Sequence, residues 1–391
     1  MADFELQEHV QGIQDLSTYD ITNEHDISSM DSRAISGILE SAVEALADSS
    51  ESITEPTVFD SYRSLLKYSE SLQGSTMSKL LDSVSSAFHA EVDATLRDED
   101  DDQQAYMVHK LPLEMYAFLL HWFVTAADKV KSAGEDDDAP PPPAARGRRG
   151  RGGKAAASRA KKTEVWSWMD HIPNILSLIC KVFKLKTQRI WTTTAERDTF
   201  VNCLTSPAYR VMENAEYMKD QDTRMWAYKV VCLAVKLHGH SLTAQISIMQ
   251  NLQFYEHIGE PMAELLWVLV KEYDHPQLCD EVLREVAGKT FSGQDPKGGR
   301  TVAKFLVKLV QLTSRSVLKQ ISLLLALLDS EFYPIRVALV EVIGFLIEDI
   351  ATAEDVTDQN QNHVRKQLNG LYDLLLERTL DIAVSLSSGL R

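Results

Sequence analysis

The chain has no long apolar run and no sign of a targeting segment. No stretch approaches the roughly 20 consecutive apolar residues that a membrane-spanning helix requires. The opening residues, MADFELQEHVQ, lack the basic and then apolar order of a secretory signal peptide. The sequence therefore predicts a soluble protein inside the cell that has no membrane partner.

Cysteine is also scarce. The 391 residues include four cysteines, which are 23, 29 and 47 positions apart and lie in apolar, helix-like surroundings. This spacing is typical neither of a disulfide framework nor of a zinc site. We expect reduced core thiols, in the cytosol or nucleus, at Cys180, Cys203, Cys232 and Cys279.

Motifs for catalysis and ligand binding are missing or incomplete. Gly288–Thr290 matches the end of the phosphate-binding loop motif. However, Leu283 occupies the position where that motif requires a glycine, and no strand precedes the segment. His238 and His240 have no cluster of Cys, Asp or Glu nearby to complete a metal site, and Gly239 fits a helix C-cap. No G-x-S-x-G elbow occurs. We predict that the chain is not an enzyme and uses no cofactor, metal or small-molecule substrate. An enzyme whose site is assembled from distant residues is the alternative.

What the chain does contain is charge, unevenly distributed. Residues 1–138 carry 29 acidic and 8 basic side chains, a net charge of −21, whereas the whole chain is at −17, so residues 139–391 are at +4. Between Arg146 and Lys162 there are eight basic residues and no acidic one. The chain consists of an acidic front, a basic tract and a nearly balanced body.

A change of composition marks a boundary between residues 131 and 162. Glu135–Asp138 is acidic, and it is followed by four prolines at 140–143 and then by arginine and glycine. Such a segment cannot bury a core, so we expect a disordered linker. The predicted organisation has four parts: a poorly ordered N-terminus at 1–30, a helical amino-terminal domain at 31–130, the linker at 131–162 and helical repeats at 163–391.

Apolar residues recur with the helical period on both sides of this linker. Across Leu113–Val124 the apolar positions follow a 3.6-residue period, and Pro112 is suited to a first helical turn. The same spacing returns at Met262–Val270, Val302–Val310 and Ile335–Leu346. No segment of comparable length alternates apolar and polar residues as a half-buried strand would. The pattern predicts an all-α protein.

Helix breakers divide the body into hairpins. Leu327–Asp329 ends one apolar helix and Pro334 opens the next, which is the layout of a HEAT repeat. Hairpins that bury their apolar stripes against one another form an α-solenoid. The turn aspartates Asp220, Asp274 and Asp329 are 54 and 55 residues apart, longer than the roughly 40–47 residues of a HEAT or armadillo repeat. We therefore expect an irregular HEAT-type α-solenoid with extra helices, preceded by a smaller helical region and the linker.

Two long segments of the body have distinctive sequences. They read TRMWAYKVVCLAVKLHGHSLTAQISIMQNLQFYEHIGEPMAELLWVLVKEYDHPQLCDEVLREVAGKTF and GGRTVAKFLVKLVQLTSRSVLKQISLLLALLDSEFYPIRVALVEVIGFLIED. They resemble the condensin subunit 1 family, the D-type HEAT-repeat subunits of condensin. The resemblance extends from about Glu196 to Arg378, and residues 53–130 are similar to the amino-terminal domain of that family.

The resemblance implies a non-catalytic scaffold that helps to compact mitotic chromosomes. Its implied partners are the kleisin chain, the SMC ATPase heads and DNA or chromatin without sequence preference. Its implied location is the nucleus and the chromosome, with a cytoplasmic pool. The surface that serves each partner is left open. A generic HEAT-repeat adaptor, such as a transport receptor or a phosphatase scaffold, is the alternative function.

Two basic clusters are candidate phosphate contacts. For the first we predict either DNA contact or a nuclear import signal, and the alternative is a solvated tract that offsets its acidic neighbour. Its members are Arg146, Arg148, Arg149, Arg151, Lys154, Arg159, Lys161 and Lys162. The second, weaker cluster is either an ordered ridge of cations or a solvated face whose lysine stems cover apolar surface. Its members are Lys181, Lys184, Lys186 and Arg189.

The resemblance also implies that the solenoid is truncated at its carboxyl end, because family members continue with further repeats. Leu368–Leu375 begins another amphipathic helix, but Thr379–Arg391 ends in serines and glycine and starts no new hairpin. A terminal repeat normally has a polar outer face. We therefore expect the Leu374–Leu376 surface to be exposed.

Overall fold

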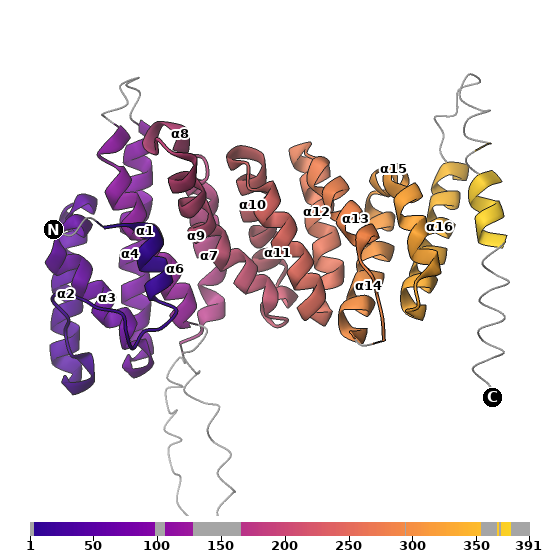
Figure 1. Cartoon of the computed structure of the whole chain (residues 1–391). Coiled ribbons are helices and arrows are strands. Elements are labelled where there is room, and N and C mark those ends of the chain that lie inside the picture. The colour runs from indigo at the N-terminus through magenta and orange to yellow at the C-terminus, as the bar shows by residue number, and fades with distance from the viewer. Residues whose placement is uncertain are drawn as a thin grey trace, which may run out of the picture. The chain divides into compact units, whose positions relative to one another are not determined.

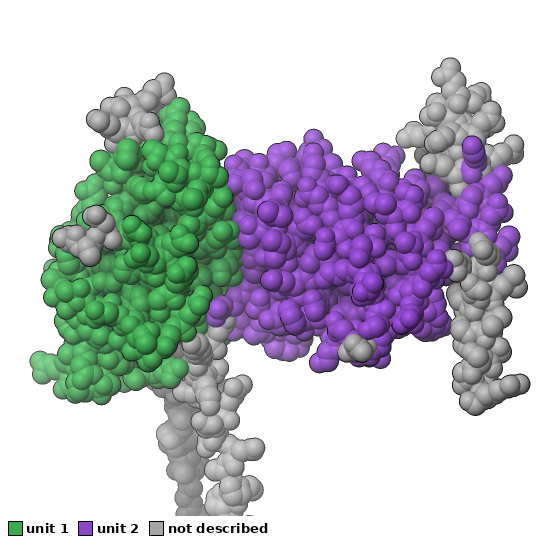
Figure 2. Space-filling view, in the orientation of Figure 1, with its two compact units in different colours: residues 1–207 green, residues 208–391 purple. Residues whose placement is uncertain are grey.

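A computed structural model describes residues 4–97, 106–127, 166–293, 295–352, 366 and 369–376. Within these ranges the chain is helical and has no strand, so the predicted all-α fold class is confirmed. No helix in the same ranges combines the length and the apolar character that crossing a membrane demands. The chain divides into two compact units, residues 1–207 and residues 208–391 (Figure 2).

The first unit is built from helices of very different length. They are α1 (Leu6–Gly12), α2 (Ser32–Asp48), α3 (Pro56–Lys67), α4 (Gly74–Arg97), α6 (Lys110–Ala127), α7 (Ile172–Val182), α8 (Thr187–Ile190) and α9 (Thr194–Glu213), whose last turns belong to the second unit. Helix α6 packs against α1, α3 and α4, while α2 lies on α3 and α4 (Figure 1). The unit therefore has α6 at its centre.

Helix α6 lies in the core because it is apolar on nearly every side. It is the predicted helix, with Pro112 in its first turn. Tyr116, Phe118 and Trp122 are at most 1% exposed. A helix that is hydrophobic all round has no face for water, so neighbouring helices must cover it.

Residues 4–30, which we expected to be poorly ordered, pack onto this core instead. The ring of Phe4 meets those of Phe59 and Phe118 edge-on, with centroids 5.3 and 5.9 Å apart. Ile21 and Ile27 are at most 3% exposed. The expectation of disorder is wrong for this segment, because its anchoring residues are isolated and follow no helical period. Residues 1–3 lie outside the described part of the chain.

The boundary between the compact units does not coincide with the predicted division at 131–162. Helix α7 follows that segment in the sequence but packs on α4, so the first helices after residue 163 complete the first unit. The division falls at Pro207, inside α9. Residues 131–162 themselves are outside the described ranges, and the disordered linker stays a prediction.

The second unit is a stack of antiparallel hairpins in two layers. Its helices are α10 (Gln221–His238), α11 (Ser241–Phe254), α12 (Gly259–Tyr273), α13 (Gln277–Gly288), α14 (Pro296–Leu312), α15 (Ser314–Leu324) and α16 (Tyr333–Thr352). One layer contains α10, α12, α14 and α16, each packed on the next, and the other contains α11, α13 and α15 (Figure 1). This is the arrangement of an α-solenoid, in which each hairpin covers the apolar stripe of its neighbour. The three helical patterns predicted in the body are α12, α14 and α16.

The hairpins of this unit are more even than the aspartate spacing indicated. Helices α10, α12, α14 and α16 begin at residues 221, 259, 296 and 333, so successive starts are 38, 37 and 37 residues apart. Asp220 precedes α10, Asp274 follows α12, and Asp329 precedes α16. Three helices, not two, separate each pair of aspartates. Besides the α-helices, the short 3-10 helices η6 (Glu256–Ile258) and η7 (Leu325–Asp329) lie between α10 and α16. The long aspartate spacing arises because the aspartates are not equivalent positions of one repeat.

Local signals explain where these helices begin and end. Oδ2 of Asp220 accepts a hydrogen bond from the backbone N–H of Thr223 at 2.8 Å, which caps the first turn of α10. Gly239 has φ of 69° and ends α10, as predicted for a C-cap. Asp274 ends α12 in the same left-handed region, with φ of 48°. The side chain of Asp295 caps α14, and Pro296 follows it at the first helical position.

A short helical turn at residues 369–376 follows α16 in the described part of the chain. Leu371 is buried there, whereas Tyr372 and Leu376 are 47% and 62% exposed. The predicted exposure of the Leu374–Leu376 surface is therefore confirmed at Leu376, while Leu374 and Leu375 are half-buried. The segment Thr379–Arg391 lies outside the described residues.

Candidate functional site

The first predicted basic cluster lies outside the residues that the structure describes. It comprises Arg146, Arg148, Arg149, Arg151, Lys154, Arg159, Lys161 and Lys162. Its role as a DNA contact or an import signal stays a prediction, based on charge alone.

In the second predicted cluster, Lys181 is already engaged by the protein itself. Its ammonium lies 2.5 Å from Oδ1 of Asp93 and 2.8 Å from Nε2 of His89. The contact joins α7 to α4, and the hydrogen bond from Lys181 holds the pKa of Asp93 below its usual value. Because this ammonium already has a carboxylate partner, a phosphate would have to compete for it.

Of the other members of this cluster, one contacts a neighbouring aromatic residue and two are exposed. Nη1 of Arg189 donates to the hydroxyl of Tyr106 at 3.3 Å, and its guanidinium lies over the Tyr106 ring at 5.4 Å. Lys184 and Lys186 are exposed and have no ion pair or side-chain hydrogen bond with any residue that the structure describes. Two of the four cations, Lys181 and Arg189, therefore already have partners within the protein. Two lysines remain as candidate phosphate contacts.

A buried polar pair fixes α6 against α4 in the first unit. Nδ1 of His109 lies 2.6 Å from Oε1 of Glu91, and the hydroxyl of Ser50 donates to Oε2 of Glu91 at 2.7 Å. The Glu91 side chain is 1% exposed. A buried carboxylate is costly unless it is paired and hydrogen-bonded, so this network holds the helices in register. Sequence reasoning missed it, because its members are brought together only by the fold.

A second buried carboxylate links α6 to the segment before α9. Nε1 of Trp191 donates to Oε1 of Glu114 at 2.6 Å, and Trp191 is fully buried. Burial raises the pKa of Glu114 above its usual value, although this hydrogen bond opposes the shift. The pair orients the indole against Phe200, whose ring centroid is 4.2 Å away. Its geometry is that of a packing contact.

The four cysteines are buried thiols that form no disulfide, as expected for core residues. Burial raises the pKa of Cys203 far above its usual value and that of Cys279 to about 12. Since the thiolate is the reactive form, neither sulfur is poised as a nucleophile. In the described ranges no group of three or more His, Cys, Asp or Glu side chains is placed to hold a metal ion. His240 is instead stacked on Tyr209.

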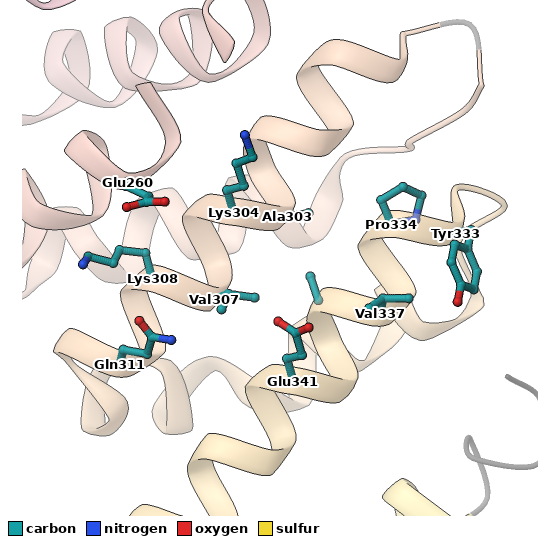
Figure 3. A pocket seen from close by; sticks show the side chains of 11 residues that line it. Glu260, Ala303, Lys304, Val307, Lys308, Gln311, Tyr333, Pro334, Val337 and Glu341 are labelled. Carbon is teal, nitrogen blue, oxygen red and sulfur yellow. The ribbon is translucent and has the colours of Figure 1, made fainter. Parts of the chain in front are cut away.

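A concave surface lies in the second unit, lined by residues of α12, α14 and α16. It is a groove of about 490 Å³. Lys304, Lys308 and Gln311 project from α14, and Tyr333, Val337 and Glu341 project from α16 (Figure 3). The remaining lining residues are Glu260, Ala303, Val307, Pro334 and Ala338. The groove combines an apolar floor with charged edges, which suits a peptide more than a small metabolite.

No sequence motif marks this groove, because three helices supply its lining residues. The one available signal was the composition of α14. That helix has four basic residues and no acidic one over PKGGRTVAKFLVKLVQL.

A known protein family matches part of the chain. Residues 74–244 match the family described as non-SMC mitotic condensation complex subunit 1, N-term. The match begins in α4 and ends in α11. It overlaps the predicted region of resemblance at 196–244 and also covers much of the region that was predicted to be similar to the family's amino-terminal domain.

Curated proteins give the same result over more than half of the chain. The chain is 34% identical over 222 residues to condensin complex subunit 1 of Schizosaccharomyces pombe, which is 56% of this chain and 19% of that protein. It is 31% identical over 212 residues to the Saccharomyces cerevisiae protein of the same name, which is 54% of this chain and 18% of that protein. The human protein is 26% identical over 219 residues, covering 53% and 16%. The resemblance to condensin subunit 1 is confirmed, and the chain spans about a fifth of the length of the relatives it matches.

Proposed function

From this similarity to condensin complex subunit 1, we propose that the chain acts within condensin, in the condensation of mitotic chromosomes. The observation that carries the proposal is the match of residues 74–244 to the non-SMC subunit 1 family, together with relatives of that name in two yeasts and in human. A role of this kind needs surfaces for partners and no chemistry of its own. The helical hairpins of the second unit support a scaffold role.

We propose the kleisin chain and the SMC ATPase heads as its protein partners. The two layers of the second unit present long helical faces, and the groove between α12, α14 and α16 is one concave surface among them. The helical repeats from residue 163 supply these faces, with α7, α8 and most of α9 also completing the first unit.

DNA is the third proposed partner, and its contact is assigned to the basic tract between Arg146 and Lys162. Eight cations without an acidic neighbour in the tract would release counterions from DNA and bind it without sequence preference. Lys184 and Lys186 are secondary candidates, because both are exposed. The same tract would serve for nuclear import, consistent with a proposed location in the nucleus and on the chromosome, with a cytoplasmic pool.

The proposal is tested by co-expressing the full chain with its kleisin and purifying through a tag on the chain. Kleisin is expected in the eluate at a fixed ratio to the chain, and the pair should elute together in size-exclusion chromatography. Kleisin expressed without the chain supplies the background. If the full chain is folded by circular dichroism but kleisin never exceeds that background, the chain does not bind kleisin by itself and this part of the proposal fails.

A further inference from the structure

Helix α14 carries a one-sided stripe of positive charge beside the groove. Lys297, Arg300, Lys304 and Lys308 are the only charged residues of this helix. At 3.6 residues per turn, their side chains fall within about 80° of its circumference and extend along about 16 Å of its axis. The stripe is therefore continuous, and Lys304 and Lys308 place its second half at the groove (Figure 3).

The four cations of the stripe are free to meet a ligand. The first three side chains are exposed and Lys308 is half-buried. Among the residues that the structure describes, none of the four has an ion pair or a side-chain hydrogen bond. Two carboxylates, Glu260 and Glu341, also line the groove, so the stripe and the groove together have an excess of two positive charges.

The floor of the groove is apolar. Ala303 and Val307 contribute from α14, and Val337 and Ala338 contribute from α16. Tyr333, the first residue of α16, also lines the groove and is 42% exposed. Its position is held by Arg336, whose guanidinium lies 5.6 Å from the centre of the Tyr333 ring. A ligand that fills this groove must bring apolar side chains as well as negative charge.

We propose that the groove between α14 and α16 binds an acidic peptide segment that carries apolar side chains beside its carboxylates. The carboxylates lie along the stripe of α14, where an extended chain at about 3.3 Å per residue needs about five residues to follow it. The apolar side chains lie on the floor formed by Val307 and Val337. The chemistry of this ligand does not depend on whether the chain joins condensin.

A nucleic-acid backbone fits the same stripe less well. Its phosphates would be attracted by the cations, and the carboxylates of Glu260 and Glu341 would repel them at short range as they would the carboxylates of a peptide. The apolar floor would contribute nothing to a phosphate backbone, whereas a peptide buries side chains on it and offers N–H groups to the two carboxylates. The groove therefore favours a peptide over DNA.

The test is fluorescence anisotropy with the full chain and a short synthetic peptide that alternates glutamate pairs with leucine and phenylalanine. The doubly substituted Lys304→Glu, Lys308→Glu chain is expected to bind this peptide about tenfold more weakly, from the loss of two charge pairs. The matched control is Arg315→Glu with Lys319→Glu on α15. Neither residue lines the groove, and the change in net charge is the same. This control chain is expected to bind as the unmodified chain does.

A third variant, Val337→Gln, separates a peptide from a nucleic acid. It alters the apolar floor without changing charge, so it should weaken the peptide severalfold and leave the binding of a short DNA duplex unchanged. Circular dichroism and thermal unfolding of each variant establish that the fold is intact.

Three results would overturn the inference. One is an absence of binding by the probe peptide. Another is equal weakening by the α14 and α15 charge variants, which would reveal attraction to net charge only. The last is tight DNA binding that depends on Lys304 and Lys308 together with peptide binding that ignores Val337. None of these results bears on the proposed association with kleisin, since the assay contains no condensin subunit.

Discussion

Replacing Gly259 by alanine tests how closely α12 is packed on α14. Gly259 is the first residue of α12, and a Cβ at this position would lie 2.7 Å from the carbonyl oxygen of Thr301 and 3.3 Å from the backbone nitrogen of Phe305. Both are backbone atoms of α14, so no side chain can rotate away to make room. The two helices would have to separate, and the stacking of the hairpins would loosen with them.

The magnitude follows from two opposing effects. Overpacking of this kind typically costs about 1–3 kcal/mol. Alanine is favoured over glycine by up to about 1 kcal/mol in a helix interior, and by less in the first turn where Gly259 lies. We therefore expect Gly259→Ala to lower the free energy of unfolding by about 1–2 kcal/mol. The matched control is Gly344→Ala in α16, where a Cβ would have no neighbour within 4 Å. That variant should gain about 0.5–1 kcal/mol.

The assay is urea unfolding of the full chain followed by far-UV circular dichroism, with hydrogen exchange read on peptides from α12 and α14. Gly259→Ala should shift the transition to lower urea and speed exchange in both helices, while Gly344→Ala should shift it upward. If Gly259→Ala stabilises the chain as much as Gly344→Ala does, α12 and α14 are not in close contact at this position.

Three further predictions concern groups on other surfaces and in the two cores. Burial, reinforced by the charge of His238, lowers the pKa of His240 from 6.5 to about 4. The unfolded chain therefore binds more protons in this range, and the stability that the neutral ring contributes is complete above pH 6.5 and is lost as pH falls towards 4. Between about pH 7 and pH 5 the free energy of unfolding should fall by about 2 kcal/mol because of this group. Urea unfolding at the two pH values should show that His240→Gln reduces the pH dependence by that amount. An unchanged pH dependence would assign it to other groups. In the first unit, His109→Phe leaves the buried carboxylate of Glu91 without its imidazole partner and should lower the free energy of unfolding by about 3 kcal/mol. The control His89→Gln, at the exposed pair with Asp93, should lower it by less than about 0.5 kcal/mol. Equal losses of stability in thermal unfolding would contradict this difference. Substituting Arg146, Arg148, Arg149 and Arg151 with glutamine should reduce the salt slope of DNA binding by up to about three to four units if all four contact phosphate, and a slope that does not change would leave import or solubility as the role of the tract.

Periodicity predicted the long helices of this chain well, because each of them buries a regular apolar stripe. The patterns at Met262–Val270 and Val302–Val310 are α12 and α14, and Gly239 ends α10 as its sequence context indicated. Periodicity failed for residues 4–30, where single residues such as Phe4 and Ile27 pack against the core without a repeat.

Spacing along the chain also misled where different positions of a hairpin carry the same residue type. Asp220 caps the start of α10 and Asp274 ends α12, so counting between them spans three helices. The aspartates are 54 and 55 residues apart, but this distance is not the length of one repeat.

The candidate sites depended on contacts that no sequence window contains. Lys181 looked like a surface cation until the fold brought Asp93 to 2.5 Å from it. The carboxylate of Glu91 and the ring of His109 come from two separate segments of the chain. The groove takes its lining from α12, α14 and α16. Only the positive charge of α14 is visible in the sequence. The apolar floor beside it, which makes it part of a candidate binding groove, is formed by the fold.

The most direct test of the central claim is mass spectrometry of the proteins that co-purify with the tagged full chain from mitotic cells. A condensin scaffold predicts that kleisin and both SMC ATPase subunits are enriched well above an untagged control. Running the Lys304→Glu, Lys308→Glu chain alongside shows whether the groove contributes to any of these associations. If condensin subunits stay at background while transport factors or phosphatase subunits are enriched, the chain is a different kind of helical adaptor and its proposed role in condensin is wrong.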